Sequence, residues 1–270
     1  EVTALISGND GNFWESQINA PSPEKNEDLR DELIIEFPKP AGARKVKLVA
    51  NAWTTMWGSQ VAKRFLELYG SSLNDWTRDV DNFGPEYFWV MNWYASEELY
   101  LLKIQVETGA GWKQRGMIFG GGPFVAKDKA YELDISDVPG ERLKIKFRPP
   151  AMFWKIDSLT VDYSNDPAMS ITELAPLEAI DKTGQDVREL LSANDGLYLT
   201  MPNIADSAEV IFLALPLAAG MERSLILKTT GYYEIHLETK GEPQTEIIER
   251  IHHEPGYLSL IHISEPTRPY

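Results

Sequence analysis

Strict alternation of apolar and polar residues constrains the fold of this chain more than any other feature. Residues 102–107 read LKIQVE, and residues 143–148 read LKIKFR. Because successive side chains of a β-strand point to opposite sides, each segment has one apolar face and one polar face. Both segments are therefore predicted to be half-buried strands.

Five further segments have the same character with less regular alternation, and Pro or Gly separates many of them. They are residues 32–37, 45–53, 112–119, 130–135 and 152–163. Seven strands joined by short turns predict a mainly β fold, a sandwich or jelly roll. In the last segment the apolar positions change parity between Ile156 and Leu159, so we expect a β-bulge near Asp157 and Ser158.

One helix is predicted to interrupt the strands, over residues 56–69. Val61, Phe65 and Leu68 recur at spacings of four and three, which places them on one face of a helix. A threonine before this segment can cap the first turn, and Gly70 can end the helix. We expect the apolar face to pack against the sandwich.

Tryptophan usage and turn chemistry change together near residue 165. All eight Trp residues lie between Trp14 and Trp154, and the polar segment 164–167 contains a proline that disfavours helix. The sequence therefore predicts a β-sandwich domain over residues 1–165 and a small β-rich domain over residues 170–257. Five short strands and one short helix are expected in the second domain.

The order of strands over roughly residues 30–164 resembles a galactose-binding-like β-sandwich, with late strands that contain FWKID and DYS. In addition, FWKIDSLTVDYS (153–164) and GYYEIHL (231–237) are similar to segments of uncharacterised bacterial proteins that are predicted to be exported. The resemblance implies a jelly-roll-like sandwich and an extracellular or periplasmic location. It brings no ligand motif with it.

Residues 258–270 do not look like natural protein sequence. Residues 258–268, LSLIHISEPTR, resemble codon by codon the in-frame translation of a sequencing-library transposase adapter. We therefore expect the natural sequence to stop at Tyr257 and the tail to be a non-native scar outside the fold. The same resemblance implies that the gene was read from short fragments of environmental DNA.

Charge and reactive residues argue against several functions. The formal net charge is −15 and the basic residues are scattered singly among carboxylates, so no nucleic-acid partner is expected. The chain contains no Cys, which removes disulfides, thiolate nucleophiles and zinc–thiolate sites. Only four His are present, and none precedes His236. No apolar run is long enough to span a bilayer, so membrane insertion is not expected.

The aromatic stretch over residues 87–94 is the main indication of a ligand site. Trp89, Trp93 and Tyr94 lie with Asn92 in a segment of weak periodicity, which we expect to be an irregular connection. Trp rings stack on sugars and also fill cores. These four residues are the predicted carbohydrate ligands, and packing in the core is the alternative.

One loop offers oxygen ligands for a cation. Residues 8–12, GNDGN, combine short oxygen-bearing side chains, and calcium needs several oxygen ligands. Asp10 and Asn12 are the predicted ligands of a structural calcium ion, and no other cofactor is expected. A turn stabilised by the Asn and Asp side chains is the alternative.

Three functions remain open at this point. The first is a non-catalytic binding or adhesion module of an exported bacterial protein, with carbohydrate or another cell-surface polymer as its ligand. The second is a structural or assembly domain of a larger surface protein. The third is a glycan-active enzyme that uses carboxylates alone, with Asp134, Asp137, Asp157 and Asp162 as candidates. The lack of Cys and the scarcity of His favour the first.

Overall fold

The chain divides into two units. A computed structural model describes residues 2–17, 29–166, 168–233, 237 and 239–258. The first unit consists of Glu1–Asn165 and Leu237–Tyr270, and the second consists of Asp166–His236. The division after Asn165 coincides with the end of the predicted first domain. The second unit, however, ends at His236, whereas the predicted second domain runs to residue 257.

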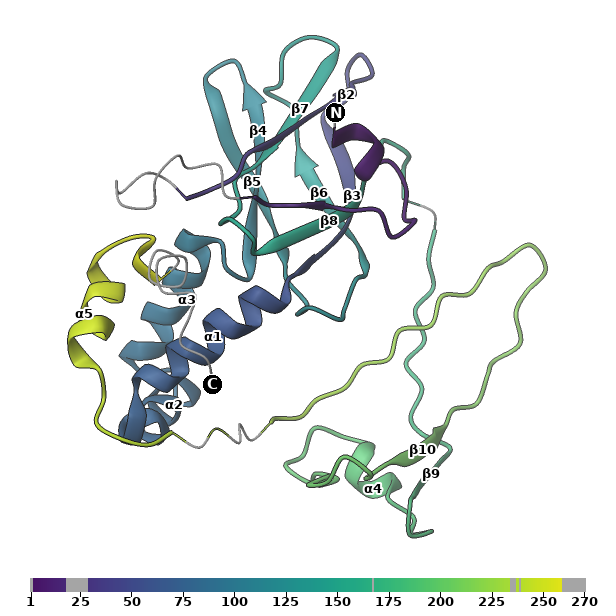
Figure 1. Ribbon diagram of the computed structural model, residues 1–270. Helices are drawn as coiled ribbons and strands as arrows, with labels where there is room; N and C mark the ends of the chain where they lie inside the picture. The colour runs from purple at the N-terminus through teal and green to yellow at the C-terminus, as the bar shows by residue number, and fades with distance from the viewer. Residues whose placement is uncertain (1, 18–28, 167, 234–236, 238, 259–270) are drawn as a thin grey trace. The chain divides into compact units, whose positions relative to one another are not determined.

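Two four-stranded antiparallel sheets form the centre of the first unit (Figure 1). One sheet has the order β1-β8-β3-β6 and consists of Trp14–Glu15, Trp154–Asp162, Lys45–Thr54 and Asp128–Asp134. The other has the order β2-β7-β4-β5 and consists of Leu33–Pro38, Arg142–Phe147, Leu101–Thr108 and Gly111–Phe119. The predicted mainly β fold is confirmed, and each of the seven predicted strands is present. The galactose-binding-like jelly roll stays a prediction.

The apolar positions of the alternating strands form one hydrophobic core. Leu102 and Ile104 of β4 are fully buried, and so are Leu48 and Trp154 of the other sheet. All four belong to the same cluster of buried side chains. Burial of a large aliphatic side chain stabilises the fold by about 1.5–3 kcal/mol, so the alternation that identified the strands also supplies a large share of the stability.

The bulge predicted in the last strand of the sandwich is confirmed. In the pairing of β3 with β8, Asn51 lies opposite Ser158 while Ala52 lies opposite Ile156, so Asp157 is an extra residue. A bulge places two successive residues of one strand opposite a single residue of its partner. Asp157 and Ser158 therefore both lie beside Asn51, on the side of the sheet away from the core.

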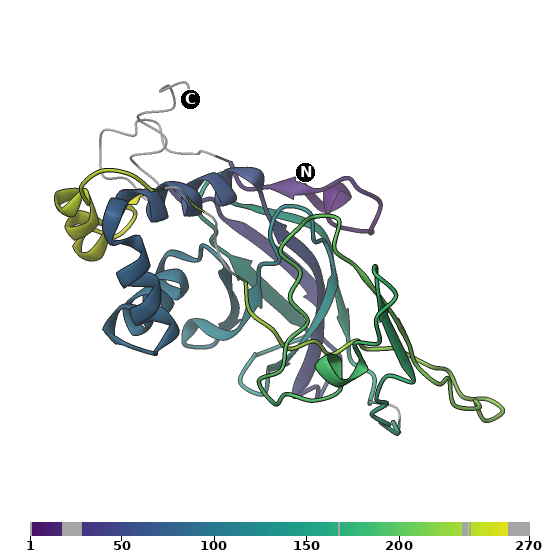
Figure 2. The same cartoon turned by 90° about the horizontal axis from the view of Figure 1, so that it is seen from below.

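A layer of helices lies beside the sheets (Figures 1 and 2). The helix predicted over residues 56–69 is confirmed as α1, Met56–Leu68, whose first turn is capped by Thr55. Val61, Phe65 and Leu68 on its apolar face are buried, as expected. The 3₁₀ helix η2, Gly70–Ser72, leads into α2, Leu73–Asp81. Among the described residues, no helix combines the length and apolar character needed to cross a bilayer.

The segment expected to be an irregular connection is a helix, α3, Pro85–Glu97. Proline is favoured at the first position of a helix, where its missing N–H costs nothing. The helix ends at Glu98, which adopts the left-handed conformation at φ 58°. α3 has apolar residues of its own on all sides, so its sequence lacks the one-sided apolar periodicity by which a helix is predicted.

The last described helix, α5, Thr245–His253, returns to the first unit and packs against α1. The Gln244 N–H donates to the Leu68 carbonyl at 2.8 Å, and the Ser71 N–H donates to the Gly241 carbonyl at 2.9 Å. Ile251 of α5 belongs to the hydrophobic core. These contacts explain why the chain from residue 237 onward groups with the sandwich.

The expected non-native tail begins with a residue that packs. Leu258 is buried and belongs to the core cluster of the first unit. The expectation that the whole tail lies outside the fold is therefore wrong for this residue. Residues 259–270 lie outside the described part of the chain.

The second unit has little regular structure. Strands β9, Glu178–Asp181, and β10, Ala208–Ile211, pair antiparallel, and the short helix expected in this domain is present as α4, Arg188–Leu191. Most of the apolar runs that predicted strands form none in residues 168–233. Within that part, the buried apolar side chains are Ala179 and Val187.

The N-terminal segment of the first unit, a 3₁₀ helix η1 (Val2–Leu5) followed by β1, is attached to β8 through Ser16. The side chain of Ser16 is fully buried. Its hydroxyl donates to the Pro150 carbonyl at 2.9 Å and accepts the N–H groups of Phe153 and Trp154 at 3.1 and 3.2 Å. The Phe153 N–H also donates to the Pro150 carbonyl at 3.3 Å, so the Trp154 N–H is the donor for which the Ser16 hydroxyl matters most.

We expect the Ser16→Ala substitution to lower the free energy of unfolding by about 1–3 kcal/mol, the cost of a buried donor left without a partner, because the Trp154 N–H loses its bond to the Ser16 hydroxyl. Urea denaturation measures the change. Ser7→Ala is the control, since the Ser7 hydroxyl is exposed and its bond to the Ala4 carbonyl is 3.4 Å long. Equal small effects of both substitutions would show that Ser16 does not hold β1 in place.

Candidate functional site

The predicted aromatic ligands lie in the helical layer, with their ring faces covered. Trp93 is only 7 % exposed and belongs to the core. The Trp89 ring stacks on the rings of His252, Trp93 and Phe65, at centroid distances of 3.7, 5.3 and 5.9 Å. A sugar cannot stack on an aromatic face that another packed ring already covers. These Trp side chains therefore pack α3 and α5 onto α1 and do not present a binding platform.

The other two predicted ligands lie on different sides of α3. Asn92 is exposed, while Tyr94 is half-buried and packs against the core. Burial raises the pKa of the Tyr94 hydroxyl to about 12. The structure thus brings Trp89, Trp93 and Tyr94 together as packing residues and leaves Asn92 outside that cluster.

The predicted calcium ligands Asp10 and Asn12 are engaged with each other. Asp10 Oδ1 accepts the Asn12 N–H at 2.9 Å, and this bond lowers the pKa of the Asp10 carboxyl. Such a bond is typical of the turn that was the alternative for this loop. In the described part of the chain, no group of three or more His, Asp or Glu side chains is arranged to hold a metal ion.

Two buried oxygens without partners lie close to this loop. The Asn51 side chain donates to Asp128 Oδ1 on β6 at 2.8 Å, which directs Asn51 Oδ1 toward the bulge on β8. Neither Asn51 Oδ1 nor Asp157 Oδ1 accepts a hydrogen bond from a described residue, and both side chains are buried. Buried acceptors need a donor or a cation. The Gly11 N–H donates to Asp157 Oδ2 at 3.4 Å, so these two oxygens lie beside the 8–12 loop.

The remaining carboxylates considered for catalysis form structural bonds. Asp134 accepts the Ser136 N–H, and Asp162 accepts both the N–H and the hydroxyl of Ser164. Asp137 forms ion pairs with Lys113 at 2.9 Å and with Arg115 at 2.5 Å. These bonds lower the pKa of all three carboxyls. A general acid in glycoside hydrolysis needs a raised pKa, so none of the three is suited to that role.

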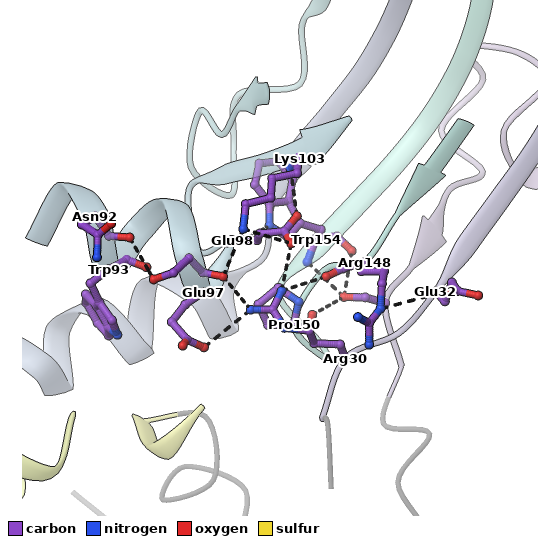
Figure 3. A network of polar contacts seen from close by, with 12 residues as sticks. Arg30, Glu32, Asn92, Trp93, Glu97, Glu98, Lys103, Arg148, Pro150 and Trp154 are labelled. Atoms are coloured by element: carbon purple, nitrogen blue, oxygen red, sulfur yellow. Dashed lines mark hydrogen bonds and ion pairs between the residues drawn. The ribbon is translucent and has the colours of Figure 1, made fainter. Parts of the chain in front are cut away.

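A buried polar network joins the end of α3 to the sheets (Figure 3). The Glu98 carboxylate accepts bonds from the Arg30 guanidinium at 3.1 Å and from the Lys103 N–H at 2.8 Å. The Glu98 carbonyl accepts the indole N–H of Trp154 at 2.7 Å, and Arg30 also lies 3.6 Å from Glu97. Burial raises the pKa of Glu98, and the bond from the Lys103 N–H, followed by the nearby cations, opposes that shift. The network has the geometry of a structural junction, and it fixes the orientation of α3.

A surface that the sequence reading missed lies on the outer side of the sheet β2-β7-β4-β5. Strand pairing places Ile34, Lys146, Gln105 and Gln114 opposite one another in a row across four strands. Trp112 lies on the same side of the sheet, and the Lys146 ammonium is 4.4 Å from the centre of its ring. The side-chain amides of both glutamines form no hydrogen bond with another described residue.

We call this surface, which consists of Ile34, Gln105, Trp112, Gln114 and Lys146, the Trp112 face. The charged side chains on and around it are paired. Lys144 lies 2.9 Å from Glu107, and Glu32 lies within 4 Å of both Lys146 and Arg148. The Trp112 face is therefore polar but nearly balanced in charge, unlike the chain as a whole. One sequence feature could have identified this face. Trp112 is an aromatic residue at a position that faces the polar side of its strand, opposite Glu107.

We expect Trp93→Ala to lower the free energy of unfolding by about 3–5 kcal/mol, the usual cost of truncating a buried aromatic side chain. Phe88→Ala on the same helix is the matched control, because Phe88 is 65 % exposed, and its effect should stay within about 0.5 kcal/mol. Chemical denaturation compares the two. An unchanged stability of the Trp93 variant would place this side chain outside the core.

The stack of His252 on Trp89 predicts a pH dependence. Burial lowers the pKa of His252, although Glu86 and Glu249 oppose the shift and His253 adds to it. The folded protein thus binds this proton less readily than the unfolded chain, whose His pKa is about 6.5. The stability from neutral His252 is therefore present above that pH and is lost as the pH falls below it.

We expect the free energy of unfolding to fall more steeply between pH 7 and pH 5 in the wild type than in His252→Phe, which keeps a stacked ring but cannot be protonated. Urea denaturation at several pH values measures both slopes. His253→Phe should change the slope only slightly, because His253 is exposed and its charge is the smallest of the four contributions to the His252 shift. Identical slopes for the wild type and His252→Phe would contradict the assignment.

Comparison with known proteins adds no family to these observations. No protein-family model matches the chain, and a search of curated proteins finds no match either. The function is therefore inferred from the chemistry of the surfaces described above.

Proposed function

We propose that the chain is a non-catalytic binding or adhesion module that holds a carbohydrate on the Trp112 face. The observation that carries the proposal is an indole ring beside two glutamine amides that have no partner among the described residues. Gln105 of β4 lies directly opposite Gln114 of β5 on one side and Lys146 of β7 on the other. Aromatic and amide groups thus share one flat surface.

Sugars match this combination of groups. A pyranose ring has an apolar C–H face that packs on an aromatic ring, and its hydroxyls both donate and accept hydrogen bonds. A glutamine amide offers two donors and one acceptor oxygen, and a Lys ammonium offers three donors. A sugar on Trp112 would displace the Lys146 ammonium from the ring and could accept a hydrogen bond from it.

The carboxylates of the Trp112 face favour binding over catalysis. Glu107 is paired with Lys144, Glu36 with Arg142, and Glu32 lies near two cations. Hydrolysis of a glycoside needs one protonated and one ionised carboxyl on either side of the scissile bond. Ion-paired glutamates on an open sheet surface do not supply that arrangement.

The proposed ligand is a polysaccharide of a cell surface, which accords with an extracellular or periplasmic location. That location rests on the resemblance of residues 153–164 and 231–237 to segments of exported bacterial proteins. An extended polymer suits the row of side chains across four strands, because successive sugar units can contact successive strands.

Assembly into a larger structure is the second candidate function, and the second unit favours it. Leu225, Ile226 and Leu227 are 74–91 % exposed, and Tyr233 is almost fully exposed. Apolar surface of this extent is typical of segments that another surface covers. In this view the second unit contributes contacts to a larger surface protein.

We expect Trp112→Ala to lower affinity for a retained glycan at least about tenfold, a loss of about 1.4 kcal/mol, without changing the thermal midpoint. A glycan array identifies the ligand, and isothermal titration calorimetry compares the variants. Gln105→Ala and Gln114→Ala should each weaken binding, while Phe88→Ala on the helical layer should not. If no glycan is retained, or if Trp112→Ala binds as well as the wild type, the carbohydrate proposal fails.

A further inference from the structure

A second exposed surface lies on the first turns of α3 and on the turn before it, away from the side of the helix that packs into the core. Phe83 and Phe88 are 66 % and 65 % exposed, and Met91 is 39 % exposed. The Tyr87 ring connects the two phenyl rings, at centroid distances of 4.8 Å from Phe83 and 5.4 Å from Phe88. We call these four residues the aromatic tip. The three that belong to α3 explain why this helix has apolar residues on its outer side as well as on its inner side.

The backbone at the aromatic tip is strained. Phe83 has a φ of 56°, in the left-handed region that glycine and asparagine tolerate better than aromatic residues. Its side chain is mostly exposed, so packing within the chain does little to offset this cost. Strain of this kind is concentrated at functional sites. The conformation itself ends α2, because the Phe83 and Gly84 N–H groups donate to the Val80 and Asp79 carbonyls at 3.1 and 2.8 Å. The turn therefore explains the positive φ but not the exposed phenyl ring, and the ring is what points to a role outside the fold.

The rim of the aromatic tip is acidic. Residues 73–86 contain four carboxylates and one basic residue, Arg78, which gives a net charge of −3. Arg78 is itself paired with Asp75 at 2.7 Å. Asp81, two residues before Phe83, has no ion pair with another described residue. The tip thus combines exposed aromatic rings with uncompensated negative charge.

We propose that the aromatic tip docks a basic, amphipathic peptide segment of a partner protein. Apolar side chains of that segment would cover Phe83, Tyr87 and Phe88, and its Lys or Arg side chains would lie near Asp81 and Glu86. Aromatic residues with a charged rim are the usual composition of protein-binding surfaces. The proposal concerns a surface separate from the Trp112 face and does not depend on it.

Charge favours this partner over two others. The anionic surface of a bacterial or cytoplasmic membrane leaflet would repel a rim with a net charge of −3. A second copy of the chain would bring the same acidic rim, and a formal charge of −15, against the first. A basic segment neutralises the rim while it covers the rings.

The test uses a fluorescent amphipathic peptide of Leu and Lys and a matched peptide in which Glu replaces every Lys. Fluorescence anisotropy with the full chain should show saturable binding of the Lys peptide and none of the Glu peptide. Phe88→Ala and Phe83→Gly should each weaken binding at least about tenfold. Phe83→Gly should leave the thermal midpoint unchanged or higher, because glycine tolerates the positive φ. Trp112→Ala should bind the peptide as the wild type does.

Several outcomes would overturn the proposal. The whole chain is acidic, so binding that depends on charge alone would survive Phe88→Ala and Phe83→Gly. Equal binding of the Lys and Glu peptides would remove the role of the rim. Sedimentation of the chain with anionic vesicles, or a dimer that Phe88→Ala dissociates, would assign the tip to a membrane or to a second copy instead.

Discussion

The hydrogen bond from the Trp154 indole to the Glu98 carbonyl joins the two layers of the first unit. Trp154 is fully buried in the sandwich, and Glu98 ends α3 in a left-handed conformation. Arg30 and Lys103 bind the Glu98 carboxylate from two other segments of the chain. Because these contacts meet at one residue, the helices and the sheets form a single core, and the faces of α3 have fixed roles.

This junction separates packing aromatics from exposed ones. The inner side of α3 carries Trp89, which stacks on Phe65 of α1 and His252 of α5, and Trp93, whose ring lies tilted against that of Phe65. The outer side carries Phe88, which is mostly exposed and has its ring 5.4 Å from that of the neighbouring Tyr87. The Trp112 face lies on a rigid sheet whose other side is core. Both proposed binding surfaces therefore consist of side chains held by backbone that the core has already fixed.

Features that depend only on neighbouring residues, such as strand alternation, helix spacing and the bulge, could be predicted from the sequence. The alternation in β4 and β7, the spacing in α1 and the parity change at Asp157 each follow from a few neighbouring residues, and each is confirmed. The nature of α3 could not be read this way, because its two apolar sides cancel the periodicity. The return of α5 depends on contacts such as that of Gln244 with Leu68, which no local pattern encodes. The Trp112 face was missed because density of aromatics, not position on a polar strand face, guided the choice of Trp89 and Trp93.

Native-state hydrogen exchange tests the single core of the first unit most directly, because it measures the free energy of opening for each amide. We predict that the amides of Val90, Trp93 and Tyr94 open with the same free energy as those of β4 and β8, whereas amides of residues 221–233 exchange rapidly. If the amides of α3 open at a free energy several kcal/mol below those of the strands, the helical layer is an independent element. That result would contradict the single core of the first unit, and Trp89 and Trp93 could then have a role other than packing.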